Sequence, residues 1–200
     1  MAKVGKRNSS PLKFGLAELR DALAIAHLRN RVAERLTIDF GGGHWSSMCT
    51  EQGVVQGILS SRVLVARRDR VPVATLRLTV RKPWAIGRKY FVAGTRPIYL
   101  VDMAVDPACQ REGIGRALIE EAKRVVKGWP GDAIRLDAYD APAGAGGFYL
   151  KCGFREVGRA TYRATPLVYF EFLLENPERQ DVASPKVVRR PARRRSPGGV

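Results

Sequence analysis

Two glycines lie one residue apart in the segment DPACQREGIGRAL, residues 106–118, where an apolar run gives way to an amphipathic one. Glycine lets the backbone approach a ligand closely, and the first amides of a helix have no partner within the helix. These amides and the helix dipole attract an anion such as a phosphate. Arg111 and Arg116 add positive charge beside Gly113 and Gly115. The segment therefore predicts a phosphate-binding turn at the start of a helix.

Two common phosphate-binding motifs do not fit this turn. A Walker A loop ends in Gly-Lys followed by Ser or Thr, but Gly115 is followed by Arg116 and Ala117. A dinucleotide fingerprint needs Gly or Ala three residues after its second glycine, where this sequence has Leu118. The apolar run also ends near Asp106, too far upstream for the tight turn of a Rossmann unit.

The elements that must position this turn alternate between extended and helical patterns. β-Branched and apolar runs predict strands, and three-to-four-residue apolar spacing predicts helices. The expected strands are 12–19, 62–69, 72–80, 97–105, 133–140, 156–164 and 166–174. The expected helices are 21–36, with Asp21 as a candidate N-cap, then 50–59, a helix opened by Gly113 and ended by Gly128, and 143–154. Residues 38–48 and 81–97 are expected to be connections. The pattern indicates a single α+β or α/β domain built on one mixed sheet.

The hexapeptide Gln110-Arg111-Glu112-Gly113-Ile114-Gly115 matches the Q/R-x-x-G-x-G/A signature of the GNAT superfamily of acyltransferases, which the chain closely resembles. The hexapeptide follows an apolar strand that ends in AVDP, and FYLKCGF (148–154) is similar to a second family element. The resemblance covers roughly residues 12–175. It implies a mixed, mostly antiparallel sheet of six to seven strands with a splayed central pair, flanked by about four helices.

The resemblance also implies an activity and a cofactor. The chain is expected to be an N-acetyltransferase that moves an acetyl group from acetyl-CoA (coenzyme A) to a primary amine, by direct transfer in a ternary complex and without a metal. The splayed strand would offer its backbone to the pantetheine arm, and the glycine turn would hold the pyrophosphate. The expected cofactor-binding residues are Met103, Ala104, Val105, Gln110, Arg111, Glu112, Gly113, Ile114, Gly115 and Arg116.

Two catalytic residues are expected from the same resemblance. Tyr149, in FYLKCGF, matches the family tyrosine that protonates the departing thiolate, and its phenol is protonated at neutral pH. Asp102, on the central strand, is the candidate general base. A structural carboxylate paired with an arginine such as Arg77 is an equally weighted alternative. His44, in the glycine-rich loop, is a less favoured base, and bound water is another.

One segment departs from the family pattern. Ala145 keeps the alanine position ahead of the FY pair, but Pro142 stands where the family has Asn or Asp. Contacts from this segment to the cofactor are therefore in doubt. The cysteines 49, 109 and 152 form no CxxC pair and lie in no His/Cys pattern, so a cysteine nucleophile and a disulfide framework are both disfavoured.

The formal net charge of +16 over 200 residues is concentrated toward the two ends of the chain. Residues 1–11 are expected to be a flexible basic segment, 12–176 the acyltransferase domain, and 177–200 a disordered Pro- and Arg-rich tail. Solvated disorder is the favoured interpretation of such ends, and binding of nucleic acid is the less favoured one. The alternative to an enzyme is a low-turnover protein of the same fold that senses acyl-CoA or associates with nucleic acid.

No run of 18 or more apolar residues predicts a membrane span, no secretory signal is evident, and the odd cysteine count is typical of a reducing, cytoplasmic setting. The resemblance places the acceptor groove at residues 37–50 and 81–97. Both segments mix aromatic and basic residues, which would suit a small amine bearing a carboxylate or phosphate, although a peptide amine is equally compatible with the family. The identity of the amine and the choice between monomer and homodimer stay open.

Overall fold

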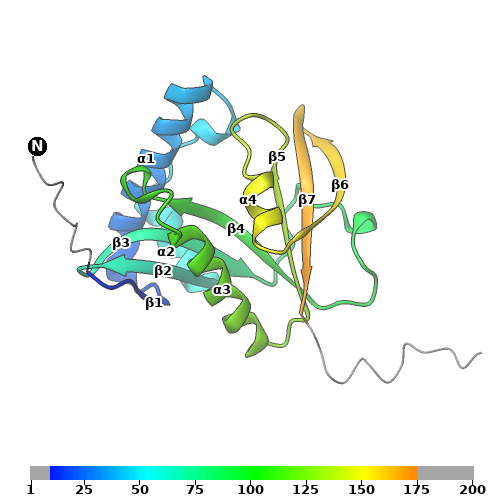
Figure 1. Ribbon diagram of the computed structural model, residues 1–200, viewed down its shortest axis with the longest axis horizontal. Coiled ribbons are helices and arrows are strands. Elements are labelled where there is room, and N and C mark those ends of the chain that lie inside the picture. The colour runs from blue at the N-terminus through cyan, green and yellow to red at the C-terminus, as the bar shows by residue number, and fades with distance from the viewer. Residues whose placement is uncertain (1–9, 175–200) are drawn as a thin grey trace, which may run out of the picture.

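Seven strands form one sheet in the order β1-β2-β3-β4-β5-β7-β6 in the computed structural model, which describes residues 10–174 (Figure 1). The strands are β1 (Lys13–Leu16), β2 (Arg62–Arg68), β3 (Val71–Thr79), β4 (Pro97–Val105), β5 (Ala133–Tyr139), β6 (Arg155–Tyr162) and β7 (Thr165–Leu173). All neighbouring pairs are antiparallel except β4 and β5, which are parallel. The expected mixed, mostly antiparallel sheet of a single domain is confirmed. Residues 1–9 and 175–200, which hold nearly all of the expected flexible ends, lie outside the described residues.

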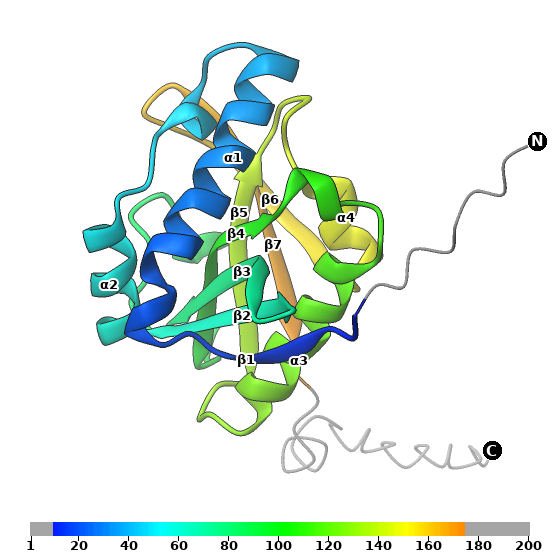
Figure 2. The ribbon, with the colours of Figure 1, turned by 90° about the vertical axis from the view of Figure 1, so that its left-hand side faces the viewer.

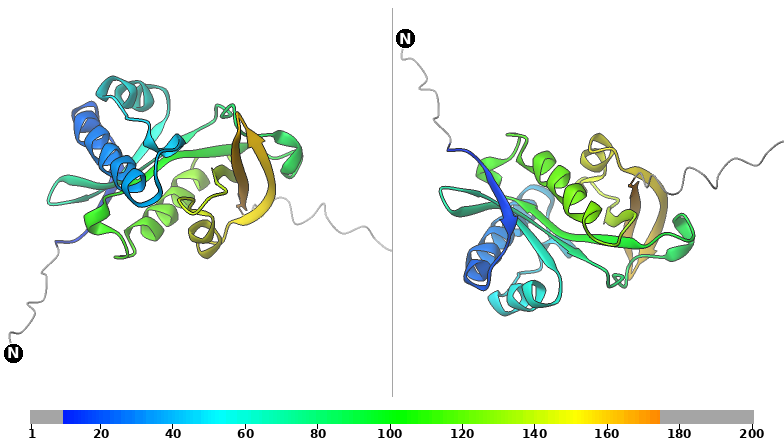
Figure 3. Two further views of the ribbon diagram at one scale, coloured as in Figure 1. Left: turned by 90° about the horizontal axis from the view of Figure 1, so that it is seen from above. Right: turned by 90° about the horizontal axis from the view of Figure 1, so that it is seen from below.

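Within the described residues, four α-helices cover the two faces of the sheet, one pair on each face (Figure 3). They are α1 (Ala22–Phe40), α2 (Glu51–Ser60), α3 (Ile114–Lys127) and α4 (Gly146–Lys151). Helices α1 and α2 enclose one apolar core against β2, and α3 and α4 enclose a larger one against the middle of the sheet. The expectation of about four flanking helices is therefore confirmed.

Helix α1 extends one turn beyond the predicted end at residue 36. It continues to Phe40, and Gly41, with φ of 79°, ends it and donates its N–H to the Thr37 carbonyl at 2.9 Å. The prediction was wrong because it followed the apolar face, and Ile38 in the last turn is 79% exposed. The helix stops at Gly41, whose positive φ a residue with a Cβ rarely adopts. Asp21 stands at the N-cap position, but its side chain forms no capping hydrogen bond there.

Strands β4 and β5 pair over only three residues and then separate. Their register joins Pro97, Ile98 and Tyr99 to residues 133–135, and no pairing follows. Each strand keeps its outer partner along its length, since β4 stays on β3 and β5 stays on β7. The backbone groups that face the gap therefore have no strand partner. This is the splayed central pair that the family resemblance implies.

A bulge interrupts β4 inside the separated part. Val101 lies opposite Arg77 and Ala104 lies opposite Thr75, so β4 has one more residue than β3 between these pairs. Asp102 has a positive φ of 57° at this point, an uncommon conformation for a residue other than glycine. Bulges re-aim side chains locally, and this one directs Asp102 toward α1 and β3, where its ion partners lie.

Candidate active site

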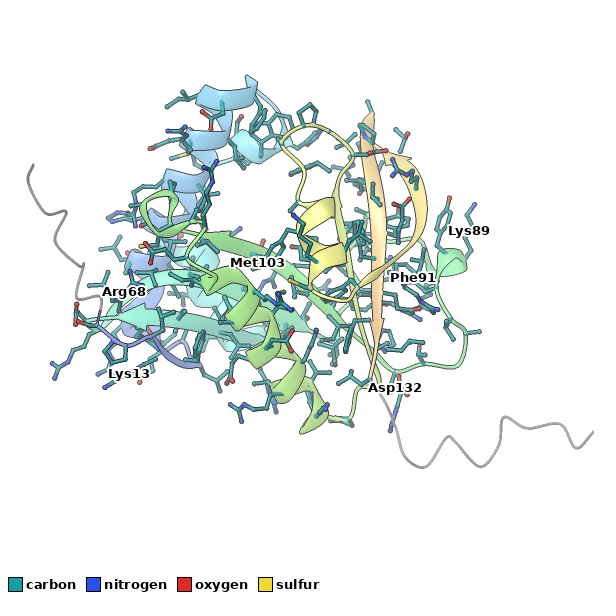
Figure 4. All side chains as sticks on the ribbon, viewed as in Figure 1. Lys13, Arg68, Lys89, Phe91, Met103 and Asp132 are labelled. Carbon is teal, nitrogen blue, oxygen red and sulfur yellow. The ribbon has the colours of Figure 1, made fainter. Side chains whose placement is uncertain are left out.

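The gap between β4 and β5 opens into a cavity of about 660 Å³. Its walls come from α1, from the α1–α2 and β3–β4 connections, from β4 and β5, and from the start of α4. Figure 4 shows Met103 beside the open space between α1 and α4. Of the predicted site residues, Asp102, Met103, Ala104 and Tyr149 line this cavity. The structure thus brings both expected catalytic side chains and two of the expected pantetheine contacts to one space.

The predicted pyrophosphate loop lies at the carboxyl end of β4 and leads directly into α3. The Gln110 side chain donates to the Val105 carbonyl at 3.2 Å, which ties the loop to the strand. Glu112 points away to Arg68 on β2, at 2.8 Å. The first helical bond of α3 runs from Ala117 N–H to the Gly113 carbonyl at 3.0 Å, so the amides before it are left for a ligand. Residues 110–116 therefore comprise the loop before α3 and its first residues, where an anion can be received.

The two glycines of this loop are required for different reasons. Gly113 has a φ of 80°, in the left-handed region that side chains with a Cβ rarely adopt, and a Cβ there would meet nothing within 4 Å. At Gly115 the φ is ordinary, but a Cβ would lie 3.3 Å from Phe148 and 3.4 Å from Met103. Gly115 therefore lets α3 pack closely on β4 and α4, and Gly113 makes the turn itself.

Tyr149 is held with its hydroxyl at the gap. Its ring packs between Phe148, Phe154 and Phe170, with centroid distances of 5.3–5.8 Å, and the residue is only 7% exposed. The hydroxyl donates to the Met103 sulfur at 3.8 Å, and a thioether is a weak acceptor that a better one can replace. Burial raises the pKa of Tyr149, and the charge of Asp137 adds to the rise. The phenol is therefore protonated throughout the neutral range and able to donate.

Asp102 accepts two charge-assisted hydrogen bonds. Arg77 Nε on β3 lies 2.7 Å from one carboxylate oxygen, and an Arg29 Nη on α1 lies 2.9 Å from the other. The pairing with Arg77 is the structural alternative that the sequence left open, and Arg29 is an additional partner. Both oxygens are engaged by cations, and protonating this carboxylate would weaken two ion pairs. The role of Asp102 as a base stays a hypothesis.

Asp137 is the acidic residue of the cavity that sequence reasoning did not assign to catalysis. It lies on β5, beyond the point where β5 separates from β4, and it lines the cavity with Tyr139 and Tyr149. Within residues 10–174 no ion pair reaches it. Burial raises the pKa of Asp137, and its own backbone amide offsets this in part. A carboxyl group with a raised pKa and no cationic partner is a candidate proton acceptor.

The β3–β4 connection is fixed over the cavity by buried polar contacts. Arg135 on β5 is 5% exposed; it stacks on Phe91, donates to the Val92 carbonyl at 2.7 Å and pairs with Glu171 at 3.0 Å. Tyr169 donates to the Ala85 carbonyl at 2.5 Å. The connection is an ordered irregular segment with one short turn of 3-10 helix, Arg88–Tyr90. It packs on β4 and β7 through a third apolar cluster.

The segment before α4 contains a glycine that the sequence analysis did not explain. A Cβ on Gly144 would lie 1.9 Å from the Tyr139 carbonyl oxygen, so only glycine fits this turn. Ala145 and Ala143 line the cavity beside Tyr149. Gly144 therefore allows the chain to turn so that the start of α4 lies against the end of β5, and this turn positions Tyr149.

The remaining candidates have lesser roles in this geometry. His44 and Cys49 line the cavity from the α1–α2 connection. The pKa values of Cys109 and Cys152 are raised, chiefly by burial, which disfavours their thiolates. Among residues 10–174 no three His, Cys, Asp or Glu side chains gather as a metal site. In the same part of the chain no helix is long and apolar enough to cross a membrane.

Comparisons with solved structures show the same fold. An N-acetyltransferase from Staphylococcus aureus superposes with a TM-score of 0.63 at 15% identity, covering 83% of this chain and 100% of that one. The ribosomal-protein-S18-alanine N-acetyltransferase from Escherichia coli gives 0.62 at 17%, over 84% and 98%. A structure from Salmonella typhimurium that contains acetyl-CoA as its cofactor gives 0.60 at 15%, over 82% and 94%. Comparison with curated protein sequences finds no significant match.

A family model described as the acetyltransferase (GNAT) domain matches residues 60–156. The matched segment runs from the start of β2 to the start of β6, and it contains the splayed pair, the glycine loop, Asp137 and Tyr149. The fold of the whole described chain agrees with it. Residues 60–156 therefore match the acetyltransferase (GNAT) domain, and the described chain has the fold of solved N-acetyltransferases.

Proposed function

We propose that this protein transfers the acetyl group of acetyl-CoA directly to an amine that is bound in the same cavity. The observation that carries the proposal is the gap between β4 and β5. The anion-accepting start of α3 lies beside it, and Asp137 and Tyr149 line the cavity into which it opens. A protein that only sensed acyl-CoA would not need a proton donor and a proton acceptor facing one space.

Residues 101–105 and the glycine loop would hold the cofactor. The unpaired backbone of β4 can bond to the amide groups of the pantetheine arm as an added strand would. The free amides of residues 110–116 would receive the pyrophosphate, with positive charge from Arg111 and Arg116. A backbone amide of 103–105 at the gap is the proposed donor to the oxygen of the thioester as negative charge develops on it.

Asp137 is the proposed general base. Its pKa is raised toward neutral pH, and a carboxylate with a higher pKa is a stronger base that takes a proton from an ammonium group more effectively. Asp102, whose oxygens are already held by Arg29 and Arg77, is proposed as a positioning residue that joins α1 to β3 beside the cavity. This assignment favours the structural alternative for Asp102 over the base role.

Tyr149 is the proposed general acid. Asp137 takes one proton from the ammonium group, and the neutral nitrogen then attacks the thioester carbon. The C–S bond breaks, and the second proton lost by the nitrogen replaces the one that Tyr149 gives up. The departing thiolate takes the phenolic proton of Tyr149, so the products are the N-acetylated amine and coenzyme A. No cysteine is required to carry the acetyl group, which is consistent with the raised pKa of Cys109 and Cys152.

The direct experiment is an initial-rate study of amine-dependent release of coenzyme A. Varying acetyl-CoA at several fixed amine concentrations should give intersecting double-reciprocal lines, because both substrates must be bound before reaction. A Cys49→Ser variant should retain the rate. Parallel lines together with loss of activity in that variant would establish an acetyl-cysteine intermediate and contradict the proposal.

We also propose a division of the chain into domains. We assign acyl transfer to residues 12–176 and no part of the chemistry to the basic ends. Removing residues 177–200 should leave kcat/KM for a small amine unchanged in the same assay. A loss of transfer would assign the C-terminal segment to the active site.

A further inference from the structure

Besides Tyr149, four aromatic side chains from four different segments line the cavity. They are Trp45, Trp84, Tyr139 and Tyr162. The α1–α2 connection, the end of β5 and the turn between β6 and β7 all lie at the end of the molecule where α1 finishes (Figures 1 and 2). Trp84 is 83% exposed. Because this indole is exposed to water at the edge of the cavity, a bound apolar group that covers it would bury apolar surface and gain binding free energy.

Two of these rings are held in place before any acceptor binds. The indole N–H of Trp45 donates to the Gly41 carbonyl at 3.0 Å. The Trp45 ring meets the Tyr139 ring edge-on, with centroids 5.4 Å apart and planes at 71°. A Cβ on Gly43 would fall 2.6 Å from the Trp45 ring, so the loop glycines make room for the indole. Together the four aromatic side chains form an aromatic wall, and its Trp45 and Tyr139 part is preorganised, which lowers the entropic cost of binding a flat group.

The charges in the cavity differ from those expected from the two connections. Among the described lining residues the one arginine or lysine is Arg29, and it is engaged by Asp102. Lys82 donates to the carbonyls of Pro83 and Ile86 instead of facing the cavity. The basic residues of 81–97 thus do not gather where an anionic acceptor would need them. Asp137 carries the unpaired charge of this lining, and that charge attracts a cation.

We propose that the acceptor is a small amine joined to an aromatic or similarly flat apolar group, without an anionic substituent. This inference rests on the proposed function and names the substrate class of the same site. The ring would contact Trp45, Trp84 and Tyr162, and the ammonium group would lie between Tyr139 and Asp137. Loss of a proton to Asp137 then leaves the neutral nitrogen that attacks the thioester.

The test compares acetylation of three matched amines with saturating acetyl-CoA. 2-Phenylethylamine carries the ring, 2-cyclohexylethylamine has a similar size without π electrons, and phenylalanine adds a carboxylate to the same ring. We expect kcat/KM for 2-phenylethylamine to exceed that of each of the other two by about tenfold or more. An alanine-initiated hexapeptide serves as a fourth acceptor, to distinguish a small amine from a protein N-terminus.

Variants assign the preference to the aromatic wall. Trp84→Leu and Trp45→Leu should each lower the ratio of phenyl to cyclohexyl kcat/KM at least about threefold, chiefly through KM for the phenyl amine. Phe40→Leu is the matched control, because Phe40 is also an exposed aromatic residue near this end of α1 but does not line the cavity. Trp84 is so exposed that its variant should fold normally, so the test does not depend on Trp45→Leu.

The outcomes separate this inference from the proposed function. Equal rates with the phenyl and cyclohexyl amines, a preference for phenylalanine, or faster acetylation of the peptide would each overturn the aromatic-amine assignment while transfer itself stands. Calorimetric binding of acetyl-CoA without acetylation of any amine would also overturn it. A folded protein that neither binds acetyl-CoA nor transfers acetyl would refute the proposed function itself.

Discussion

Replacing Asp137 by asparagine keeps the shape of the side chain and removes the proposed proton acceptor. General-base catalysis contributes about 10²–10⁴-fold to the rate, so kcat/KM for an amine should fall by that factor. This corresponds to about 2.7–5.4 kcal/mol of transition-state stabilisation at about 1.36 kcal/mol per tenfold. Arg29 and Arg77 pair with Asp102 and not with Asp137, so the substitution breaks neither ion pair.

The same substitution should not destabilise the fold. Burial raises the pKa of Asp137, so the folded state favours the protonated form relative to the unfolded chain. The associated stability is present below the unfolded pKa of about 3.9 and is lost as pH rises through the folded pKa. At neutral pH the ionised carboxylate is therefore a cost that asparagine removes. Asp137→Asn should melt at the same or a higher temperature than wild type at pH 7, with the difference shrinking toward pH 4.

The assay is the pH dependence of kcat/KM in wild type, Asp137→Asn and two control variants. Wild type should lose activity as pH falls through the raised pKa of Asp137, and Asp137→Asn should lack that step while the ionisation of the amine remains. Asp140→Asn removes an exposed carboxylate three residues away, paired with Arg159, and should behave as wild type. Asp102→Asn should keep the acidic step, because its role is positioning.

The reasoning would be refuted by an Asp137→Asn protein with undiminished kcat/KM and an unchanged pH profile. Loss of the acidic step in Asp102→Asn instead would return the base role to Asp102. A marked fall in melting temperature at pH 7 for Asp137→Asn would show that its carboxylate stabilises the fold, against the direction of its pKa.

Three further substitutions test other parts of the structure. Tyr149→Phe should lower kcat about 10²-fold with little change in KM, because only the proton donor to the leaving thiolate is lost. If the variant released coenzyme A as fast as wild type, Tyr149 would not be the general acid. Gly113→Ala places a Cβ on a residue with a φ of 80° and should lower the free energy of unfolding, measured with denaturant, by about 1–2 kcal/mol. In the control Gly147→Ala the new Cβ meets nothing within 4 Å, so this variant should be no less stable than wild type. Glu171→Gln breaks a buried ion pair with Arg135 and should lower the free energy of unfolding by about 3–5 kcal/mol, which lowers the melting temperature by roughly 6–20 °C. The control Glu156→Gln changes an exposed residue and should have almost no effect on the melting temperature. Similar melting temperatures for the two variants would contradict the burial assigned to Glu171.

The parts of the fold that local patterns determine were predictable from the sequence. Helix α3 follows from the apolar spacing of residues 114–126 behind a glycine turn, and β4 follows from a continuous apolar run. The last turn of α1 was missed because its residues face solvent and carry no apolar period. A helix can continue on backbone bonding alone until a glycine ends it.

The parts of the site that depend on pairing were not predictable in the same way. The bulge at Asp102 is a difference of one residue between β3 and β4, which appears only when their register is known. Asp137 looks in the sequence like one polar residue in a strand. Its importance comes from lying past the point where β5 leaves β4, beside Tyr149 in one cavity. The turn glycine Gly144 likewise has meaning only through the carbonyl that it approaches.

The measurement that tests the central claim most directly is calorimetric titration of the full-length protein with acetyl-CoA, compared with Gly113→Asp. That substitution places a carboxylate where the pyrophosphate would lie, and Gly147→Asp adds the same charge on α4 as the control. Wild type and Gly147→Asp should bind in the micromolar range, and Gly113→Asp should bind at least about 100-fold more weakly, from the repulsion between like charges. Absence of binding to folded wild type, or equal binding to all three proteins, would contradict the assignment of the glycine loop to acetyl-CoA.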